Sequence, residues 1–309
     1  MTAERIEIAD RDGTYLTLHG FGFDISAAEL LARRAHFRSL SFAEIDMARS
    51  STAPSTTPWT EYLKVPHLPV AVVLDRLSIG RLALAPPVLG EGLVATLEGN
   101  AKLSGETAHV ALDLHRTDGS AGNILLAMEL AGATPVLGLR LEASEPTGVL
   151  LDRLLGRTDR PPLALSVNGT GLLADWHGQV SASAGALARL DADVTLAVAA
   201  ETVLGLSGTA AFAPLLPAEF ASLVGDRLTL SLRASFGDRI VVDPLSIEIA
   251  AGTLTGDAVY GGPEKAVAAH LRAKLPELSQ FAGLVGNPLK GSATVTAAVS
   301  GTDSRPLSS

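Results

Sequence analysis

The chain contains no cysteine in its 309 residues. This absence excludes disulfides, thiolate catalysis and any zinc site that depends on cysteine ligands. Aromatic residues make up only 4% of the chain, so its apolar surface consists mainly of Leu, Val, Ala and Ile and offers few of the aromatic anchors typical of protein-binding hot spots. A smooth aliphatic surface suits acyl chains, and it suits the core of an ordinary sheet equally well.

Long apolar runs and excess positive charge are also lacking. Although 47% of the residues are hydrophobic, no stretch reaches the ~18 consecutive apolar residues that a membrane-spanning helix needs. The formal net charge of −9 argues against nucleic acid as a partner, because phosphate binding requires a basic stripe. An expected strand at Ile6 to Ile8 follows Met1 with no signal peptide between them. Taken literally this predicts a cytosolic protein; if the chain is part of a longer protein, a targeting segment precedes it and the inference fails.

The chain is rich in alternating apolar and polar residues. From Leu228 to Phe236 it reads LTLSLRASF, with an apolar side chain at every second position, which is the pattern of a β-strand with one apolar face. The same alternation recurs along the chain and predicts an all-β protein with short helices, folded as an elongated, curled β-sheet groove. The candidate lining residues are Leu228, Leu230, Leu232, Phe236, Ile240, Val242, Leu245, Ile247, Ile249, Val110, Leu112, Leu114, Val194, Leu196 and Val198.

Three segments are expected along the chain. Residues 1–49 form an N-terminal β-α-β module, in which a turn at Asp10 to Gly13 precedes strands at 15–18 and 21–25, and Ser26 with Glu29 forms a helix-capping box. Residues 50–69 are rich in Pro, Ser and Thr and predict a linker or loop. Residues 70–309 read as strand after strand with glycine-containing turns, which predicts a repeating β-groove.

Short helices are expected near residues 146–156, 217–225 and 276–286, each opened by a proline and closed near a glycine. The second and third are related, because both have Leu-Pro before the helix and Leu-Val-Gly at its end. Pro217 and Pro276 are 59 residues apart. This internal repeat of one helix plus several strands predicts a stack of modules in which each contacts only its neighbours.

Three segments match known binding motifs in part, and the residues around each argue against the corresponding site. Gly169 to Ala174 fits G-x-G-x-x-A, yet a dinucleotide site must open a helix, and the residues after Ala174 predict a turn and a strand. Residues 286–292 (GNPLKGS) lack the order of a phosphate-binding loop. Asp10-x-Asp12-Gly13 begins like a calcium loop and then loses every later ligand, so a turn is the better interpretation.

The histidines do not form a recognisable metal or catalytic site. His109 and His115 would share a strand face but stand six residues apart, which is too far for one metal ion within a single strand. The chain has no G-x-S-x-G motif, and no grouping of Ser, His and acid stands out. We therefore expect no enzyme, no cofactor and no metal.

The order of several segments resembles the translocation and assembly module subunit TamB family, within the AsmA-like group. The N-terminal part, IEIADRDGTYLTLHGFGFDIS, is similar to the region that follows the family's membrane anchor. Residues 68–105, 161–194, 216–232 and 275–301 are similar to successive parts of the same proteins. Neither the anchor helix nor the C-terminal domain of the family is present, so the chain resembles the N-terminal portion of a much longer protein.

The resemblance implies a location and partners. TamB-like proteins are anchored in the inner membrane, extend through the periplasm, pair with the outer-membrane barrel TamA, and are linked to outer-membrane biogenesis, protein secretion and phospholipid transport through a curled sheet with an apolar concave side. It thus implies a periplasmic chain, attached through an anchor outside this sequence, with phospholipid acyl chains as ligands.

Three interpretations of function stay open. The first is a passive conduit for phospholipid. The second is a chaperone-like scaffold for outer-membrane β-barrels or autotransporters, which would pair with incoming strands at exposed sheet edges. The third is a closed structural β-solenoid without a ligand. The width of the interior distinguishes them, because a core filled by its own side chains leaves no room for lipid.

Overall fold

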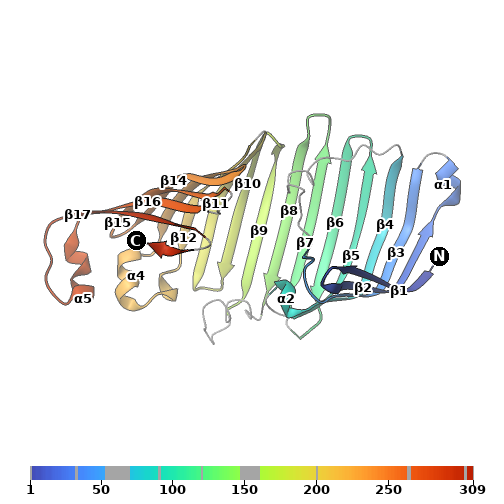
Figure 1. The fold of residues 1–309 in the computed structure, drawn as a ribbon, viewed down its shortest axis with the longest axis horizontal. Helices are drawn as coiled ribbons and strands as arrows, with labels where there is room; N and C mark the ends of the chain where they lie inside the picture. Colours follow the sequence, from blue (N-terminus) through green and yellow to red (C-terminus); the bar gives the residue numbers. More distant parts are fainter. Residues whose placement is uncertain are drawn as a thin grey trace. The chain divides into compact units, whose positions relative to one another are not determined.

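The computed structural model describes residues 2–31, 34–52, 70–89, 92–119, 121–146, 161–199, 201–262, 266–302 and 305–308. The chain divides into two compact units, Met1–Leu172 and Leu173–Ser309. Both consist of β-strands with a few short helices (Figure 1), which confirms the predicted all-β class. None of the described helices is long and apolar enough to cross a membrane.

In its described residues, unit 1 (residues 1–172) is a sheet of long strands with two short helices. Its strands are β1 (Thr2–Asp10), β2 (Gly13–Ile25), β3 (Arg34–Met47), β4 (Ala71–Leu84), β5 (Leu93–Ser104), β6 (Thr107–Arg116), β7 (Asn123–Ala131), β8 (Val136–Glu145) and β9 (Leu163–Leu172), and its helices are α1 (Ala27–Leu31) and α2 (Pro86–Leu89). Each of these strands pairs with its neighbour in sequence, antiparallel except for the parallel pair β3 and β4. The N-terminal module predicted at residues 1–49 thus shares one sheet with the strands that follow it.

Unit 2, residues 173–309, repeats this plan. Its strands are β10 (Asp175–Ala184), β11 (Ala188–Val198), β12 (Thr202–Ala211), β13 (Leu228–Phe236), β14 (Arg239–Ile249), β15 (Gly252–Gly261), β16 (Ala266–Leu275), β17 (Ala293–Thr302) and β18 (Arg305–Ser308). All of these strands pair antiparallel with their neighbours in sequence. In neither unit does a described pairing join the first strand to the last, so each sheet is open within the described residues.

The short helices of unit 2 lie where the prolines and glycines predict them. The helix expected at 217–225 is α4 (Ala218–Val224), with Pro217 before it and Gly225 after it. The helix expected at 276–286 is a 3-10 turn, η3 (Leu278–Phe281), that continues into α5 (Ala282–Val285). A further 3-10 turn, η2 (Ala213–Leu215), precedes α4. Outside the described residues lie most of the helix predicted at 146–156 and residues 53–69 of the predicted linker.

Bulges keep apolar residues on one face where strict alternation fails. In β14, Val242 and Leu245 are three residues apart, and a regular strand would point them to opposite faces. The register shifts between them against both neighbouring strands, so that Val242 lies opposite Ala234 and Leu245 opposite Leu232. Pro244 lies within this shift, where a residue without an N–H group is tolerated. In β4, register shifts against β5 act in the same way on apolar pairs spaced by three.

The N-terminal strands are more continuous than predicted. Instead of separate strands at 15–18 and 21–25, the structure has the single strand β2, which passes through Gly20 with a φ of +60°. A side chain at Gly20 would begin 2.6 Å from the Cβ of Ala43 on β3, so the close approach of the two strands requires glycine. The predicted turn at Asp10 to Gly13 is confirmed, with Gly13 in a positive-φ conformation.

A charged cluster ties this turn to the end of β3. Arg49 donates hydrogen bonds to both carboxylate oxygens of Asp10, at 2.9 and 2.5 Å, and its guanidinium lies 5.8 Å from the centre of the Tyr15 ring. The backbone N–H of Thr52 also donates to Asp10 at 2.9 Å. The Arg49 guanidinium, followed by the Thr52 N–H, holds the pKa of Asp10 well below its ordinary value. The turn is thus held by an ion pair between Arg49 and Asp10.

His36 on β3 joins helix α1 to strand β4. Its Nδ1 lies 2.7 Å from Oε1 of Glu29 on α1, and its Nε2 lies 2.7 Å from Oδ2 of Asp75 on β4. Both ring nitrogens donate only in the protonated ring, and the two carboxylates raise the pKa of His36, Glu29 most strongly. Ser26 precedes α1 as predicted, and its backbone carbonyl accepts from the Glu29 N–H at 3.2 Å. The predicted capping box is wrong, because the Glu29 carboxylate binds His36 and the Ser26 N–H donates to the His36 carbonyl at 2.8 Å.

We expect Gly99→Ala to lower the free energy of unfolding of unit 1 by about 1–3 kcal/mol, the usual cost of overpacking. A Cβ at Gly99 would lie 2.6 Å from the carbonyl oxygen of Ala111 on the next strand, whereas a Cβ at Gly138 meets nothing closer than 3.8 Å. Gly138→Ala is therefore the matched control and should change stability by less than about 0.5 kcal/mol. Urea denaturation followed by circular dichroism measures both, and equal effects would contradict the packing argument.

Protonation of His36 should make stability depend on pH. Because its pKa is raised in the folded state, its contribution is fully present below the ordinary histidine pKa of about 6.5 and is lost as pH rises through the higher folded value. The melting temperature of the wild type should thus exceed that of His36→Gln more at about pH 6 than at about pH 9. Glu29→Gln should shrink this difference, and a difference that stays constant with pH would contradict the ion pair.

Candidate functional site

The apolar side chains of unit 1 form rows that cross its strands. Residues directly opposite each other in neighbouring strands point to the same face of the sheet. One row consists of Leu77, Gly99, Leu112, Leu126, Leu141 and Val167, on β4 to β9. The predicted lining residues Val110, Leu112 and Leu114 all lie on this face, since Val110 is opposite Met128 and Leu114 opposite Ile124. We call this surface the apolar face of unit 1.

Unit 2 has an apolar face of the same kind. One of its rows consists of Val194, Leu206, Leu232, Leu245, Gly256, Leu271 and Ala297, on β11 to β17, and the next consists of Ala192, Gly208, Leu230, Ile247, Leu254, Ala273 and Val295. The structure brings together on this face the predicted residues Val194, Leu196, Val198, Leu228, Leu230, Leu232, Phe236, Ile240, Val242, Leu245, Ile247 and Ile249. They form a continuous aliphatic surface within the unit.

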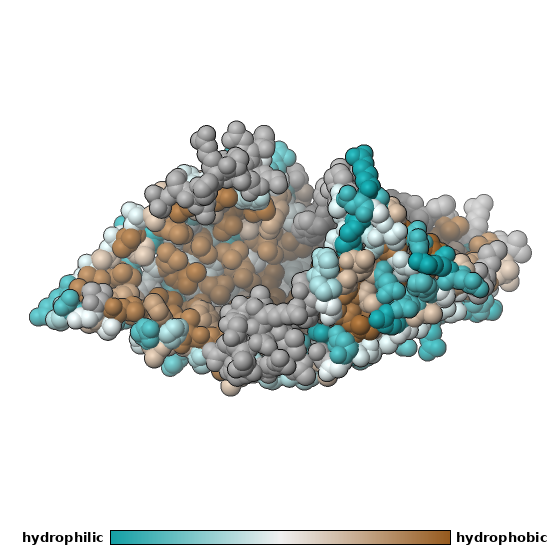
Figure 2. All heavy atoms as spheres, turned by 60° about the horizontal axis from the view of Figure 1, so that its bottom comes forward, coloured by the Kyte–Doolittle hydropathy of each residue, from teal (hydrophilic) through white to brown (hydrophobic). Residues whose placement is uncertain are grey.

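These faces are only half covered. Among the described residues, no large side chain is fully buried, and on the apolar face of unit 2 Ile240 is 38% and Val295 54% exposed. Most of the other large apolar side chains in these rows are half-buried. Figure 2 shows a hollowed surface lined by apolar side chains in the left half of the view. Sheets whose faces packed into a closed core would instead bury these residues almost completely.

The most buried residues of the apolar face of unit 1 lie toward the ends of its strands. Ala95 near the start of β5, Leu130 near the end of β7 and Leu137 near the start of β8 are 0%, 3% and 4% exposed. The row through Leu77 and Leu112 lies nearer the middle of the strands and stays half-buried. The accessible apolar surface also reaches the strand ends, since Ile124 near the start of β7 and Leu165 near the start of β9 are 40% and 36% exposed on this face.

An aromatic cluster on β2 and β3 was not predicted. The ring centres of Phe21 and Phe42 lie 5.3 Å apart, those of Phe21 and Phe23 5.7 Å, and those of Phe23 and Phe37 6.3 Å. Phe37 and Phe42 neighbour Leu74 and Ile79 on β4, which places the cluster on the apolar face of unit 1. The signal in the sequence is the shared spacing of three and two residues between apolar positions in β3 and β4, which marks them as partners.

Among the described residues, Arg116 and Glu145 are charged side chains buried on the side of the apolar face, and they form an ion pair. Arg116 lies opposite Ala95 and donates to Asp118 at 2.9 Å and to Glu145 at 3.3 Å. The side chains of Arg116 and Glu145 are 9% and 7% exposed. Removing one partner from such a group would leave an uncompensated buried charge, which is strongly destabilising.

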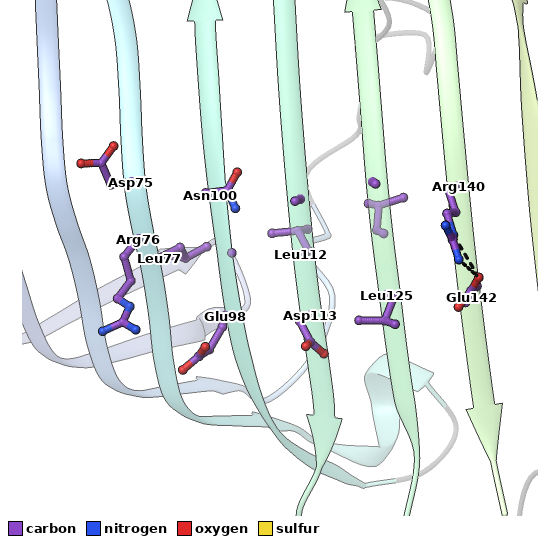
Figure 3. A pocket seen from close by; sticks show the side chains of 14 residues that line it. Asp75, Arg76, Leu77, Glu98, Asn100, Leu112, Asp113, Leu125, Arg140 and Glu142 are labelled. Carbon is purple, nitrogen blue, oxygen red and sulfur yellow. Dashed lines mark hydrogen bonds and ion pairs between the residues drawn. The ribbon is translucent and has the colours of Figure 1, made fainter.

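The opposite face of unit 1 is polar and carries a shallow cavity of about 470 Å³. Figure 3 shows its charged rim, in which Arg140 donates to Glu142 at 3.0 and 2.7 Å. Asp113 pairs with His115 at 2.8 Å. Each of these two pairs joins residues two apart on one strand.

The residues considered for metal or cofactor binding stay apart. His109 lies opposite Lys102 and Glu129, and His177 contacts Asp175 at 3.0 Å. Within the described ranges, no group of three or more His, Asp or Glu side chains is placed to hold a metal ion. Strand β9 runs to Leu172, and Leu173 and Ala174 form a turn, so the G-x-G-x-x-A segment does not open a helix.

The two faces of β16 should report different polarity. Leu271 is half-buried on the apolar face, while Arg272 beside it is exposed on the polar face. Because the chain has no cysteine, Leu271→Cys and Arg272→Cys can each be labelled alone with a polarity-sensitive fluorophore. We expect blue-shifted emission at position 271 only, since successive side chains point to opposite faces. Equal emission from both folded variants would contradict an uncovered apolar face.

The chain was compared with known proteins by sequence and by structure. No protein-family model matches it. No curated protein and no solved structure matches it either. The candidate site therefore rests on the geometry of the two apolar faces.

Proposed function

We propose that this chain binds phospholipid acyl chains on its apolar faces and acts as a passive conduit for phospholipid between membranes. One observation carries the proposal: broad aliphatic faces, several strands wide, are left half exposed in both units. Contiguous apolar patches of more than a few hundred Å² are rare on soluble monomers and usually mark an interaction site. An aliphatic lining with few aromatic anchors matches acyl chains better than a folded protein partner.

The geometry also suggests how an acyl chain would lie. Neighbouring strands are about 4.8 Å apart, so a row of opposed side chains offers an apolar contact at each strand. Rows such as the one through Leu206, Leu232 and Leu245 run across the strands. An acyl chain aligned with these rows would exchange one set of aliphatic contacts for the next without crossing a polar residue. Movement in this proposal follows a gradient or a partner protein.

The wider setting of the proposal comes from the resemblance to the TamB family. On that basis we place the chain in the periplasm, attached to the inner membrane through an anchor outside this sequence, with the outer-membrane barrel TamA as partner and outer-membrane biogenesis as its process. The charged polar faces are compatible with an aqueous compartment, since they carry exposed pairs such as Arg189 with Asp191.

A second candidate is a scaffold that pairs with incoming β-strands. The observation that favours it is the edge of β1, which among the described strands pairs only with β2. Ile6 and Ile8 on this strand are 36% and 38% exposed, and edge strands with free N–H and C=O groups are templates for β-augmentation. A closed solenoid is the least favoured candidate, because the described sheets are open.

Photo-crosslinking on β13 tests the conduit. Photoreactive side chains at Leu230 and Leu232 should capture phospholipid in cells or from vesicles, whereas those at Thr229 and Arg233 should not. Leu230 and Leu232 lie on the apolar face, and Thr229 and Arg233 are exposed on the other. Mass spectrometry of the adducts identifies the lipid. Equal capture from both sets, or none from either in a folded protein, would overturn the proposal and favour the scaffold.

A charge placed on the apolar face should block lipid passage. Leu230→Arg puts an unpaired guanidinium among aliphatic side chains, where desolvation costs several kcal/mol. The matched control is Thr229→Arg, which adds the same charge on the polar face. We expect loss of lipid transfer between vesicles for the first variant only, with circular dichroism confirming that both are folded. Full transfer by a folded Leu230→Arg variant would count against a lipid path along β13.

A further inference from the structure

Helices α4 and α5 occupy equivalent places in an internal repeat of unit 2. The sequence FASLVG at residues 220–225 corresponds to FAGLVG at residues 281–286, so Leu223 matches Leu284 and Gly225 matches Gly286. Each helix is followed by a strand of the sheet, β13 after α4 and β17 after α5. Figure 1 shows both helices at the same end of the strands of unit 2. Equivalent side chains are therefore expected in equivalent surroundings.

The end of α4 is covered by the tip of a hairpin. The turn between β14 and β15 contains Ala250 and Ala251, and their N–H groups donate to the carbonyls of Val224 and Leu223 at 3.1 and 2.9 Å. Leu223 is only 7% exposed. A Cβ at Gly225 would lie 2.9 Å from the Cβ of Ala250. The hairpin tip thus satisfies two helix-end carbonyls, buries Leu223 and packs directly against Gly225.

The equivalent end of α5 is uncovered in the described structure. Leu284 is 40% exposed. A Cβ at Gly286 would meet no described atom within 4 Å. The exposure of Leu284 and the open space at Gly286 both mark the place that the Ala250–Ala251 turn occupies on α4.

We infer that the end of α5, residues Leu284 to Gly286, is a docking surface for the tip of a β-hairpin from a further module of the same pattern. The chemistry of the occupant follows from the covered copy. It needs a residue that approaches the glycine as closely as Ala250 approaches Gly225, and a small residue in the place of Ala251, which is 0% exposed. It also needs two free N–H groups for the helix-end carbonyls. In the covered copy, that tip lies two strands beyond the helix.

A second copy of this chain is a poorer source of a hairpin tip with two free N–H groups. Its own Ala250–Ala251 turn is already bonded to its own α4, so that turn is not available to another molecule. A lipid would cover Leu284 but would donate no backbone N–H groups to the helix end. The repeat within unit 2 therefore favours a module whose first strand pairs with β17 in the place that the short strand β18 takes here, whichever polypeptide segment supplies it.

The test adds such a module to the end of the chain. A copy of residues 237–275, which contains β14, β15 and β16, replaces residues 302–309, so that β18 no longer pairs with β17. Leu284→Cys reports on the docking surface in a chain with no other cysteine. We expect maleimide labelling of Leu284→Cys to slow by about tenfold or more in the extended chain, because the site would then react only through local opening. Leu223→Cys gives the rate of a covered leucine, and Phe220→Cys, 45% exposed, should label equally fast in both chains.

A matched variant shows whether the hairpin tip is responsible. In the extended chain, replacing the residue that copies Ala250 with lysine should restore fast labelling at position 284. Unchanged labelling in the extended chain would overturn the inference, and so would added strands that stay unprotected from hydrogen exchange while the rest of the chain is folded. Protection in the original chain that rises with protein concentration would identify a second copy as the occupant, and protection that needs phospholipid vesicles would identify a membrane; either result would overturn the hairpin.

Discussion

The structure depends on keeping most of the large apolar side chains of each strand on one face of its sheet. Strand geometry enforces this through a period of two residues, and cross-strand register extends it from one strand to the next. Where the spacing of apolar residues changes to three, as between Val242 and Leu245, the register shifts by a bulge and the face is preserved. A single uncorrected slip would place charges among the aliphatic rows.

Because apolar and charged side chains lie on different faces, they stabilise the structure in different ways. The sheets are held by backbone ladders and by lateral contacts between half-buried aliphatic side chains, and no large described side chain is fully buried. Charged residues stay on the polar faces or form closed groups. Arg116 with Asp118 and Glu145, and His36 with Glu29 and Asp75, join segments that the ladder alone would leave loose.

The same arrangement carries the proposed function. A sheet that does not close over its own apolar face leaves that face available to acyl chains in the proposal. The rows of apolar side chains run across the strands, so they would orient an acyl chain perpendicular to the strands. The end of α5 is exposed in a similar way. Leu284 on α5 corresponds to Leu223 on α4, which the Ala250–Ala251 turn buries. Neither the apolar faces nor the end of α5 is fully covered by the described residues.

Local patterns in the sequence were sufficient for the strands, for the residues that share each apolar face and for α4, because alternation and proline or glycine signals act within a few residues. They did not predict the parallel pairing of β3 with β4, the aromatic cluster around Phe21 and Phe42, or the bond from Glu29 to His36 in place of a capping box. These features depend on which strands become neighbours, and that choice is made by contacts between distant residues. Alternation along the chain is enough to predict that one face of each strand is apolar. That this face stays half exposed follows from the tertiary structure, because exposure depends on what packs above the sheet and not on the strand itself.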